Sequence, residues 1–315
     1  MFIPDVRYLK SGRFYLYSSL LMAGLYIIVP NVFSAPFNDF VIQSPLIPKS
    51  EISGGGPVKD GIPSIDKPEF VSADQADFLK KDDRVLGLKI AGHIKAYPIK
   101  ILNWHEIVND GNILLSYCPL CGTGMAFNVP DADFGVSGLL YNSDMLLYDR
   151  ATESLWSQIM AQAISGKRKG EKLSMLVVEN THWENWLKKH PNTLVLSTRT
   201  GFGRDYNRSP YGSYDSSGAL YFPVSSQSRR YHPKEKVIGI QINENFKAYP
   251  FVELSKSGSR IISDEVGGEK IEVHFNSEYR SATVKLQSGE LYPSVMSYWF
   301  AWFAFHPDTQ VYVFR

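Results

Sequence analysis

The stretch VLGLKIAGHIKAYPIKIL, residues 85–102, decides the fold because a close copy of it, VIGIQINENFKAYPFVEL, follows at residues 237–254. The two segments align without gaps and are identical at eight of eighteen positions. This is far more than chance gives for one stretch. A second motif, WxxWxxxHPxT, follows each copy, at residues 183–193 and again at residues 299–309. Two matches in the same order predict a gene duplication.

Each copy has the pattern of a β-hairpin followed by a short helix. Apolar and polar residues alternate on both sides of a turn at residues 92–93, as in two antiparallel strands. Pro98 suits a first helical turn, apolar residues continue at helical spacing over residues 101–108, and residues 109–111 (NDG) end the helix. We therefore expect an α+β fold, predominantly antiparallel β with short helices, in which two duplicated halves form one compact unit.

The composition of the chain changes at several points that predict its organisation. Residues 1–35 hold three basic residues, an apolar run from Phe14 to Phe33 and small residues at the end, which is the anatomy of a signal peptide or an N-terminal membrane anchor. The following segments are an extended leader rich in Pro, Gly and Ser (residues 36–68), a first repeat half (69–199), a Gly- and Tyr-rich connection (200–235) and a second repeat half (236–315).

This organisation predicts an extracytoplasmic protein, periplasmic or secreted, that meets a membrane only through its N-terminal segment. The 33 Lys and Arg residues are balanced by 32 Asp and Glu residues and are scattered along the chain. Such a balance gives no basic surface for nucleic acid. The sequence names no protein partner and no substrate.

The two cysteines of the chain, Cys118 and Cys121, lie together in the motif YCPLCG at the end of a predicted strand over residues 113–117. The second half has no cysteine, and residues 275–277 stand at the corresponding place. Between its AYP and WxxW motifs the first half is also longer by about three dozen residues. The unshared part therefore is where chemistry is expected.

A soft metal is the first chemistry that this pair suits. Two thiolates with Met125 and His105 give enough ligands for Cu(I), which needs only two or three soft ones. Structural zinc needs four ligands, usually from two such turns, and the sequence has no second one, so zinc is disfavoured against copper. A c-type haem is excluded because Gly122 stands where a histidine is required.

Two other chemistries stay open for the same pair, and whether the chain is an enzyme is not decided. The CPLC spacing resembles that of thioredoxin-like thiol-disulfide oxidoreductases, in which Cys118 would attack and Cys121 would resolve the mixed disulfide. Residues 122–127 nevertheless predict a strand instead of the helix that those proteins place after the first cysteine. In the third alternative, a structural disulfide shapes a groove in a non-catalytic binding module.

Several motifs together resemble an exported bacterial and archaeal family known as domain of unknown function number 3179. They are NWHEIVND (103–110), SYCPLCGTGMAF (116–127), FGVSGLLYNSDMLLYDRATESLWSQ (134–158) and the stretch with GFGRDY and PYGSY (201–214). The resemblance implies no activity, because none is established for the family. Besides the cysteines and His105, it marks seven candidate site residues without a role: Glu106, Tyr148, Asp149, Arg150, Arg204, Asp205 and Tyr206.

Overall fold

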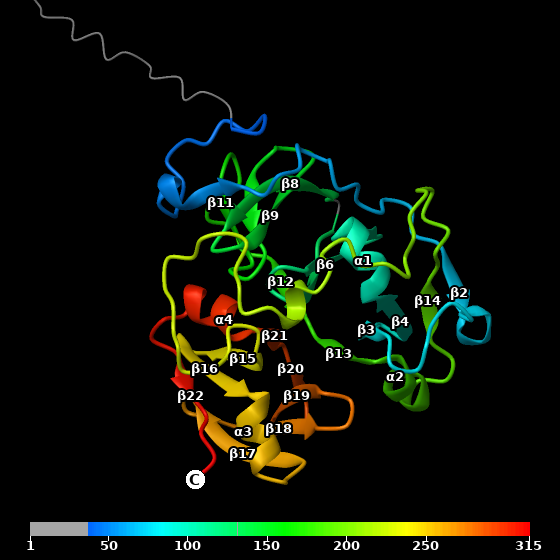
Figure 1. Ribbon diagram of the computed structural model, residues 1–315, viewed down its shortest axis with the longest axis vertical. Helices are drawn as coiled ribbons and strands as arrows, with labels where there is room; N and C mark the ends of the chain where they lie inside the picture. Colours follow the sequence, from blue (N-terminus) through cyan, green and yellow to red (C-terminus); the bar gives the residue numbers. More distant parts are fainter. Residues whose placement is uncertain (1–36, 131) are drawn as a thin grey trace, which may run out of the picture. The chain divides into compact units, whose positions relative to one another are not determined.

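The computed structural model describes residues 37–130 and 132–315 (Figure 1). These residues belong to one compact unit that spans Ser34–Arg315, and within them the chain forms five β-sheets and four short α-helices. Nearly all strand pairs are antiparallel, which confirms the predicted α+β class. The predicted signal peptide or anchor lies outside the described residues, and no helix among those described is long and apolar enough to span a membrane.

The first copy of the repeated sequence forms the core of one sheet, ordered β13-β3-β4-β14-β2. Its strands are β2 (Phe70–Ser72), β3 (Arg84–Ile90), β4 (His93–Pro98), β13 (Val178–His182) and β14 (Leu194–Leu196). β3 pairs antiparallel with β4 and with β13, whereas β14 lies parallel to β4. Helix α1 (Ile99–His105) follows β4, and helix α2 (Trp183–Lys189) follows β13.

The second copy forms a sheet of matching order, β21-β15-β16-β22. Its elements are β15 (Lys236–Ile242), β16 (Asn245–Pro250), α3 (Phe251–Lys256), β21 (Val295–Tyr298), α4 (Trp299–Phe305) and β22 (Gln310–Val311). The directions match as well: β15 is antiparallel to β16 and β21, and β22 is parallel to β16. Each repeated hairpin therefore has the same neighbours on both sides.

Two further four-stranded sheets also share one strand order. The first, ordered β12-β7-β6-β5, contains β5 (Ile107–Asp110), β6 (Ile113–Cys118), β7 (Thr123–Asn128) and β12 (Ser174–Leu176). The second, ordered β17-β18-β19-β20, contains β17 (Ile261–Val266), β18 (Glu269–Asn276), β19 (Ser281–Leu286) and β20 (Leu291–Tyr292). The cysteine motif joins β6 to β7, at the place where β18 joins β19 in the other sheet.

The remaining sheet, ordered β1-β8-β9-β10-β11, has no counterpart among the sheets described above. It contains β1 (Ile52–Gly54), β8 (Phe134–Tyr141), β9 (Asp144–Asp149), β10 (Leu155–Ser157) and β11 (Gln162–Ser165). Strands β8 to β11 come between β7 and β12, in the excess of the first half. β1 belongs to the predicted leader and pairs with β8, so this part of the leader is an edge strand of the sheet (Figure 1).

The repeated glycines and tryptophans pack against each other in the same way in both halves. A Cβ added at Gly87 would lie 2.2 Å from the ring of Trp186, and one added at Gly239 would lie 2.2 Å from the ring of Trp302. The Trp186 indole donates a hydrogen bond of 3.0 Å to Thr193, and the Trp302 indole bonds the corresponding threonine. The WxxWxxxHPxT motif therefore holds each helix against its hairpin.

One local prediction differs from the structure. The sequence predicts a helix that continues over residues 101–108, but α1 ends at His105 and β5 begins at Ile107. Between them Glu106 takes a φ of 58°, a backbone conformation that side chains other than glycine rarely adopt. Its carbonyl accepts the amide of Tyr117 at 2.8 Å. The β-sheet pairing of β5 with β6 thus outweighs helix propensity here.

Candidate functional site

The two cysteines lie in a tight turn between neighbouring strands. Cys118 is the last residue of β6 and pairs with Thr123, the first residue of β7. Gly122 has a φ of +62°, which glycine adopts without steric cost, and a Cβ there would lie 2.8 Å from the ring of Tyr298. The carbonyl of Cys121 accepts the Tyr298 amide at 2.8 Å. The turn is therefore held by β21 of the second half.

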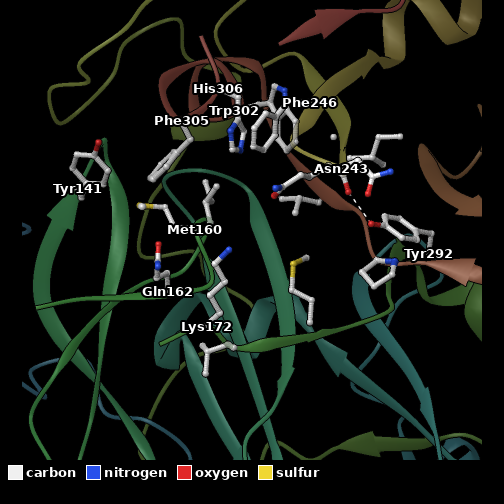
Figure 2. Close-up of a pocket in the computed structure, with 18 residues that line it drawn as sticks. Tyr141, Met160, Gln162, Lys172, Asn243, Phe246, Tyr292, Trp302, Phe305 and His306 are labelled. Carbon is white, nitrogen blue, oxygen red and sulfur yellow. Dashed lines mark hydrogen bonds between the residues drawn. The ribbon is translucent and has the colours of Figure 1, made fainter. Parts of the chain in front are cut away.

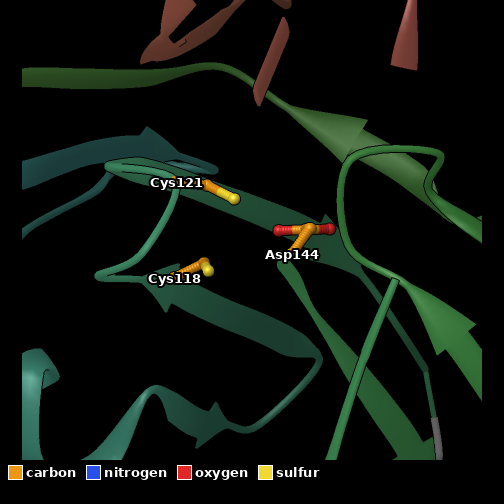
Figure 3. A group of neighbouring side chains, drawn as sticks. All are labelled: Cys118, Cys121 and Asp144. Atoms are coloured by element: carbon orange, nitrogen blue, oxygen red, sulfur yellow. The ribbon is translucent and has the colours of Figure 1, made fainter. Parts of the chain in front are cut away.

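A carboxylate from the unshared sheet faces this turn (Figure 3). Asn142 and Ser143 both have positive φ, 52° and 62°, which is the geometry of a two-residue type I′ hairpin turn between β8 and β9. The turn brings Asp144 to the cysteines: one ligand atom from each of Cys118, Cys121 and Asp144 lies within 4.8 Å of the other two. In the described part of the chain, no other His, Cys, Asp or Glu joins this group.

All three side chains are out of contact with water, since Cys118 is 1 % exposed and Cys121 and Asp144 are 0 % exposed. Burial raises the pKa of both thiols and raises the pKa of Asp144 to about 7, because a charge is costly in a low-dielectric interior. One carboxylate oxygen, Oδ2, accepts the Ile159 amide at 3.1 Å. The other, Oδ1, has no hydrogen-bond partner within residues 37–130 and 132–315.

The thiols make only weak hydrogen bonds of their own. The Cys121 thiol donates to the carbonyl of Ser143 at 3.3 Å, and the Cys118 thiol lies 3.9 Å from the same oxygen. Both cysteines are free. The same side chains can therefore close a disulfide or coordinate one ion without the loss of a strong existing bond.

Met125, a predicted ligand, lies on the same side of β7 as this group. It is 2 % exposed and belongs to the same apolar core cluster as Cys118 and Cys121. It follows Thr123, the residue opposite Cys118, by two positions, so the side chains of Met125 and Cys118 point to one face of the sheet. The thioether is thus placed among the apolar neighbours of the thiols.

His105, the other predicted ligand, is bonded elsewhere. It is 0 % exposed, its Nδ1 lies 2.8 Å from the Pro63 carbonyl, and its Nε2 lies 2.7 Å from the hydroxyl of Tyr206. Since a carbonyl only accepts, Nδ1 carries the proton and Nε2 accepts from Tyr206. Burial lowers the pKa of His105. The ring therefore joins α1 to the Gly- and Tyr-rich connection as a neutral group.

Glu106 lies beside His105 and is also buried. Its carboxylate accepts a hydrogen bond of 2.6 Å from Tyr211. Burial nevertheless dominates and raises the pKa of Glu106 to about 7. Like His105, it therefore connects the end of α1 to the loop that follows β14.

We expect the Glu106→Gln substitution to remove a pH dependence of stability. An unfolded glutamate ionises near its ordinary pKa, whereas folded Glu106 keeps its proton up to about pH 7. The folded state therefore binds more protons between these values, and the free energy of unfolding falls as pH rises, by roughly 3 kcal/mol for this group. Urea unfolding from pH 4.5 to 8 should show a flatter profile for Glu106→Gln than for the parent. Exposed Glu290→Gln is the control, and parallel profiles for Glu106→Gln and the parent would contradict the assignment.

The other predicted residues form two separate structural groups. Tyr148 and Arg150 bind Asp60, at 2.5 Å and 3.3 Å, and so attach the leader to β9. Asp149 accepts hydrogen bonds from Thr152 at 2.7 Å and from the indole of Trp156 at 3.0 Å, and thereby closes the turn after β9.

The GFGRDY motif follows the first half along its surface. Tyr206 is buried against His105, as described above, whereas Arg204 is exposed and lies over the ring of Trp104, 5.4 Å from its centroid. The carboxylate of Asp205 accepts the Asn207 amide at 3.1 Å. These contacts order this part of the connection against α1.

A cavity of about 700 Å³ lies away from the cysteines, between the unshared sheet and the second repeat (Figure 2). The rings of Trp302, His306 and Phe246 lie along one side of it, and Met160 and Lys172 lie on the opposite side (Figure 2). His306 stacks on Phe246 with ring centroids 4.0 Å apart, and burial lowers its pKa to about 4. A neutral, stacked ring is typical of packing instead of proton transfer.

Residues 59–291 match the model of a family described as "Protein of unknown function (DUF3179)". The chain belongs to this family. The match covers the cysteine turn, Asp144 and the Gly- and Tyr-rich connection, and it confirms the resemblance expected from the motifs. No curated protein and no solved structure matches the chain.

Asp144 is the residue of this DUF3179 chain that sequence reasoning missed. The sequence Asn142-Ser-Asp144, between two apolar stretches, predicts a hairpin turn, and the structure forms this turn at Asn142 and Ser143, with Asp144 as the first residue of β9. The available signal was the position of Asp144, an acidic residue that begins an apolar strand, Met145-Leu-Leu. In the structure Asp144 is buried, and a buried carboxylate needs a partner.

Proposed function

We propose that this DUF3179 protein binds a thiophilic metal ion, copper(I), in the buried group of Cys118, Cys121 and Asp144. The observation that carries the proposal is the Oδ1 atom of Asp144, a buried oxygen that has no partner other than the weakly donating S–H groups of the two free thiols that it faces. Buried polar atoms nearly always have partners. A bound cation would supply one here.

The charge of the group supports a cation as well. Two thiolates and a carboxylate would carry three negative charges in a water-free core, and this is why the thiols hold their protons without a metal. Copper(I) with a protonated Asp144, or zinc(II) with an ionised one, leaves one negative charge. The ammonium of Lys234 interacts favourably with the charge of Cys121 and can balance it.

Copper(I) is favoured over zinc(II) by the ligands that surround the thiols. Soft thiolate and thioether ligands select Cu(I), and two or three of them suffice. Met125 shares the core with both cysteines, whereas His105, an imidazole that would suit zinc, has both nitrogens in hydrogen bonds. A protonated Asp144 would still turn its Oδ1 carbonyl oxygen toward the copper, so the ion would supply the missing partner of that oxygen while the two thiolates hold it.

We expect three single variants to identify the ion. Met125→Leu should weaken Cu(I) binding at least about tenfold and leave Zn(II) binding unchanged, because only Cu(I) uses a thioether. Asp144→Asn should retain Cu(I) and lose most Zn(II), which prefers an anionic oxygen. Met175→Leu, at a partly buried methionine on β12, is the matched control. Competition titrations with chromophoric chelators measure the affinities. Equal Cu(I) affinity for Met125→Leu and Met175→Leu would argue against the thioether as a ligand.

A thiol-disulfide oxidoreductase is the second candidate, and Asp144 favours it too. A buried carboxylate whose pKa lies near neutrality can accept a proton from Cys121 when that thiol resolves a mixed disulfide on Cys118. The disulfide substrate would be reduced to two thiols while Cys118 and Cys121 are oxidised to a disulfide. The 1 % exposure of Cys118 opposes this function, because the attacking sulfur must reach its substrate. Reduction of a model disulfide by the reduced protein, faster than by Cys121→Ser, would favour it over metal binding.

We further propose that the site belongs to an exported protein built from two duplicated halves. The identical strand order of the two repeated sheets and the paired contacts of Gly87 and Gly239 support the duplication, and the predicted signal segment supports export. An alkaline phosphatase fusion at the C-terminus should be active only with residues 1–35 present. Equal activity without them would count against export by this segment.

A further inference from the structure

A second cavity, of about 390 Å³, lies on the outer side of the cysteine turn. Pro119 and Gly122 of the turn form part of its wall, and the starts of β3 and β15 form another part. The Gly- and Tyr-rich connection contributes five lining residues: Ser209, Tyr211, Gly212, Tyr214 and Asp215. The cavity therefore lies where the two repeat halves and the connection meet.

Positive side chains dominate the lining of this cavity. Five cations line it, together with one carboxylate, Asp215: Arg84, Lys100, Lys234, Lys236 and Arg280. Lys100 is paired with Asp83 at 2.8 Å, outside the lining, and no ion pair joins the other five charged side chains to one another within the ranges that the structure describes. Without Lys100, which Asp83 balances, the lining therefore carries three more positive than negative formal charges.

The hydrogen bonds of Arg84 and Lys234 go to neutral groups. Arg84 donates to the side-chain oxygen of Asn180 at 2.6 Å and to its carbonyl at 2.8 Å, and Lys234 donates to the Ala219 carbonyl at 2.9 Å. For the Lys236 ammonium, the described residues offer no hydrogen bond or ion pair. Burial lowers the pKa of Arg84 to about 10 and that of Lys236 to about 7. Arg84, Lys234 and Lys236 thus lie in a poorly solvated place, where the lining offers them a single carboxylate, Asp215.

Tyrosine hydroxyls add unpaired donors to the same wall. Tyr117, Tyr214 and Tyr298 line the cavity and are 7 %, 1 % and 5 % exposed. The hydroxyl of Tyr214 is buried without a partner in the part of the chain described. Buried hydroxyls normally form hydrogen bonds, so an acceptor is missing at this position. An oxyanion would accept from these hydroxyls and from the cations at once.

The two central cations occupy corresponding positions of the repeat. Arg84 directly precedes Val85 and Lys236 directly precedes Val237, the first residues of the two aligned segments. Each therefore begins the first strand of its hairpin, and the packing of the halves brings both to one cavity. A basic residue in both copies gives a site that neither half forms alone.

We propose that this cavity binds a small oxyanion with two or more negative charges, a phosphate, sulfate ester or dicarboxylate, against the outer side of the cysteine turn. Its volume is at the lower end of that of small-molecule sites. The excess positive charge matches a dianion, and the three tyrosines add hydrogen-bond donors and apolar ring faces. The site is separate from the buried thiols, so it does not depend on the metal proposal.

Isothermal titration calorimetry with sulfate, inorganic phosphate and citrate, at an ionic strength held constant with sodium chloride, tests the proposal. At least one of the three anions should bind with a Kd below about 1 mM, and Lys236→Gln/Arg280→Gln should weaken it at least about tenfold. Lys270→Gln/Arg260→Gln is the control for net charge. It removes two exposed cations that lie outside the cavity, one directly before β17 and one in β18. Tyr214→Phe/Tyr298→Phe removes only hydroxyls and should weaken binding while the fold is kept.

Two outcomes would overturn the anion site: no binding of any of the three anions at 10 mM, or equal weakening by the lysine-arginine pair and by its control. Cys118→Ser/Cys121→Ser should bind the anion as the parent does, which separates this site from the metal site. The three probes also identify the source of the anion, since preference for citrate indicates a carboxylate and preference for phosphate or sulfate indicates a tetrahedral group.

Discussion

The Cys118→Ser/Cys121→Ser variant is expected to lose metal binding, with an affinity for Cu(I) at least about 100-fold below that of the parent. Removal of a group that only hydrogen-bonds to a metal ligand typically lowers metal affinity by about 10- to 100-fold. This variant loses two of the proposed ligands themselves, so its loss of affinity should be at least as large. Hydroxyls are poor ligands for Cu(I), and in this core they replace two buried thiols that are 1 % and 0 % exposed. Chelator competition under anaerobic, reducing conditions measures the change.

The control for this variant must cost stability without touching the site. Ala126→Ser places a hydroxyl in the core on the opposite face of β7, in a cluster that contains neither cysteine. A buried hydroxyl costs about 1–3 kcal/mol without a partner, so both variants should unfold at lower temperature than the parent. Only the cysteine variant should lose the metal. If the cysteine variant is destabilised but binds Cu(I) like the parent, Cys118 and Cys121 are structural residues and not metal ligands.

The second large effect is expected for Gly87→Ala and Gly239→Ala, each of which should reduce the free energy of unfolding by about 3 kcal/mol. The new methyl group would lie 2.2 Å from the ring of Trp186 or Trp302, far inside contact distance. Neither ring can retreat easily, because each is fixed by a hydrogen bond from its indole to a threonine. Urea unfolding monitored by tryptophan fluorescence measures the loss.

Gly203→Ala is the matched control for these glycine variants. Its Cβ would meet no atom within 4 Å and its φ is not in the positive range, so the change should leave stability within about 0.5 kcal/mol or raise it slightly. The double variant Gly87→Ala/Trp186→Leu should recover part of the loss, because the smaller side chain leaves room for the methyl group. Additive losses in the double variant would contradict direct packing of the two residues.

Much of the fold was predictable because its signals are local. The alternation of apolar and polar residues in VLGLKIAGHIKAYP has a period of two, which predicts β-strands. The structure has a β-hairpin at this stretch, formed by β3 and β4. The same holds for the turn at Asn142 and Ser143, where positive φ favours short polar residues. The repeat predicts that its two copies form the same local structure, and each copy is a hairpin followed by a short helix.

The site was less predictable because it depends on contacts distant in sequence. Asp144 reaches Cys121 only because the unshared sheet packs on the turn after β6, and no local pattern encodes this packing. His105 lies near the cysteines in sequence, yet its ring bonds to Pro63 and Tyr206, 42 and 101 residues away. A pattern of spacing shows that a residue can act as a ligand, whereas long-range packing decides which one does.

The metal content of the purified full-length protein tests the account most directly. The protein should be reduced, loaded with Cu(I) or Zn(II), desalted, and analysed by inductively coupled plasma mass spectrometry. We predict about one copper per chain, retained against a weak chelator and absent from Cys118→Ser/Cys121→Ser, with less zinc than copper under competition. Protein that holds neither copper nor zinc after reduction and loading would contradict the proposed metal site at Cys118, Cys121 and Asp144.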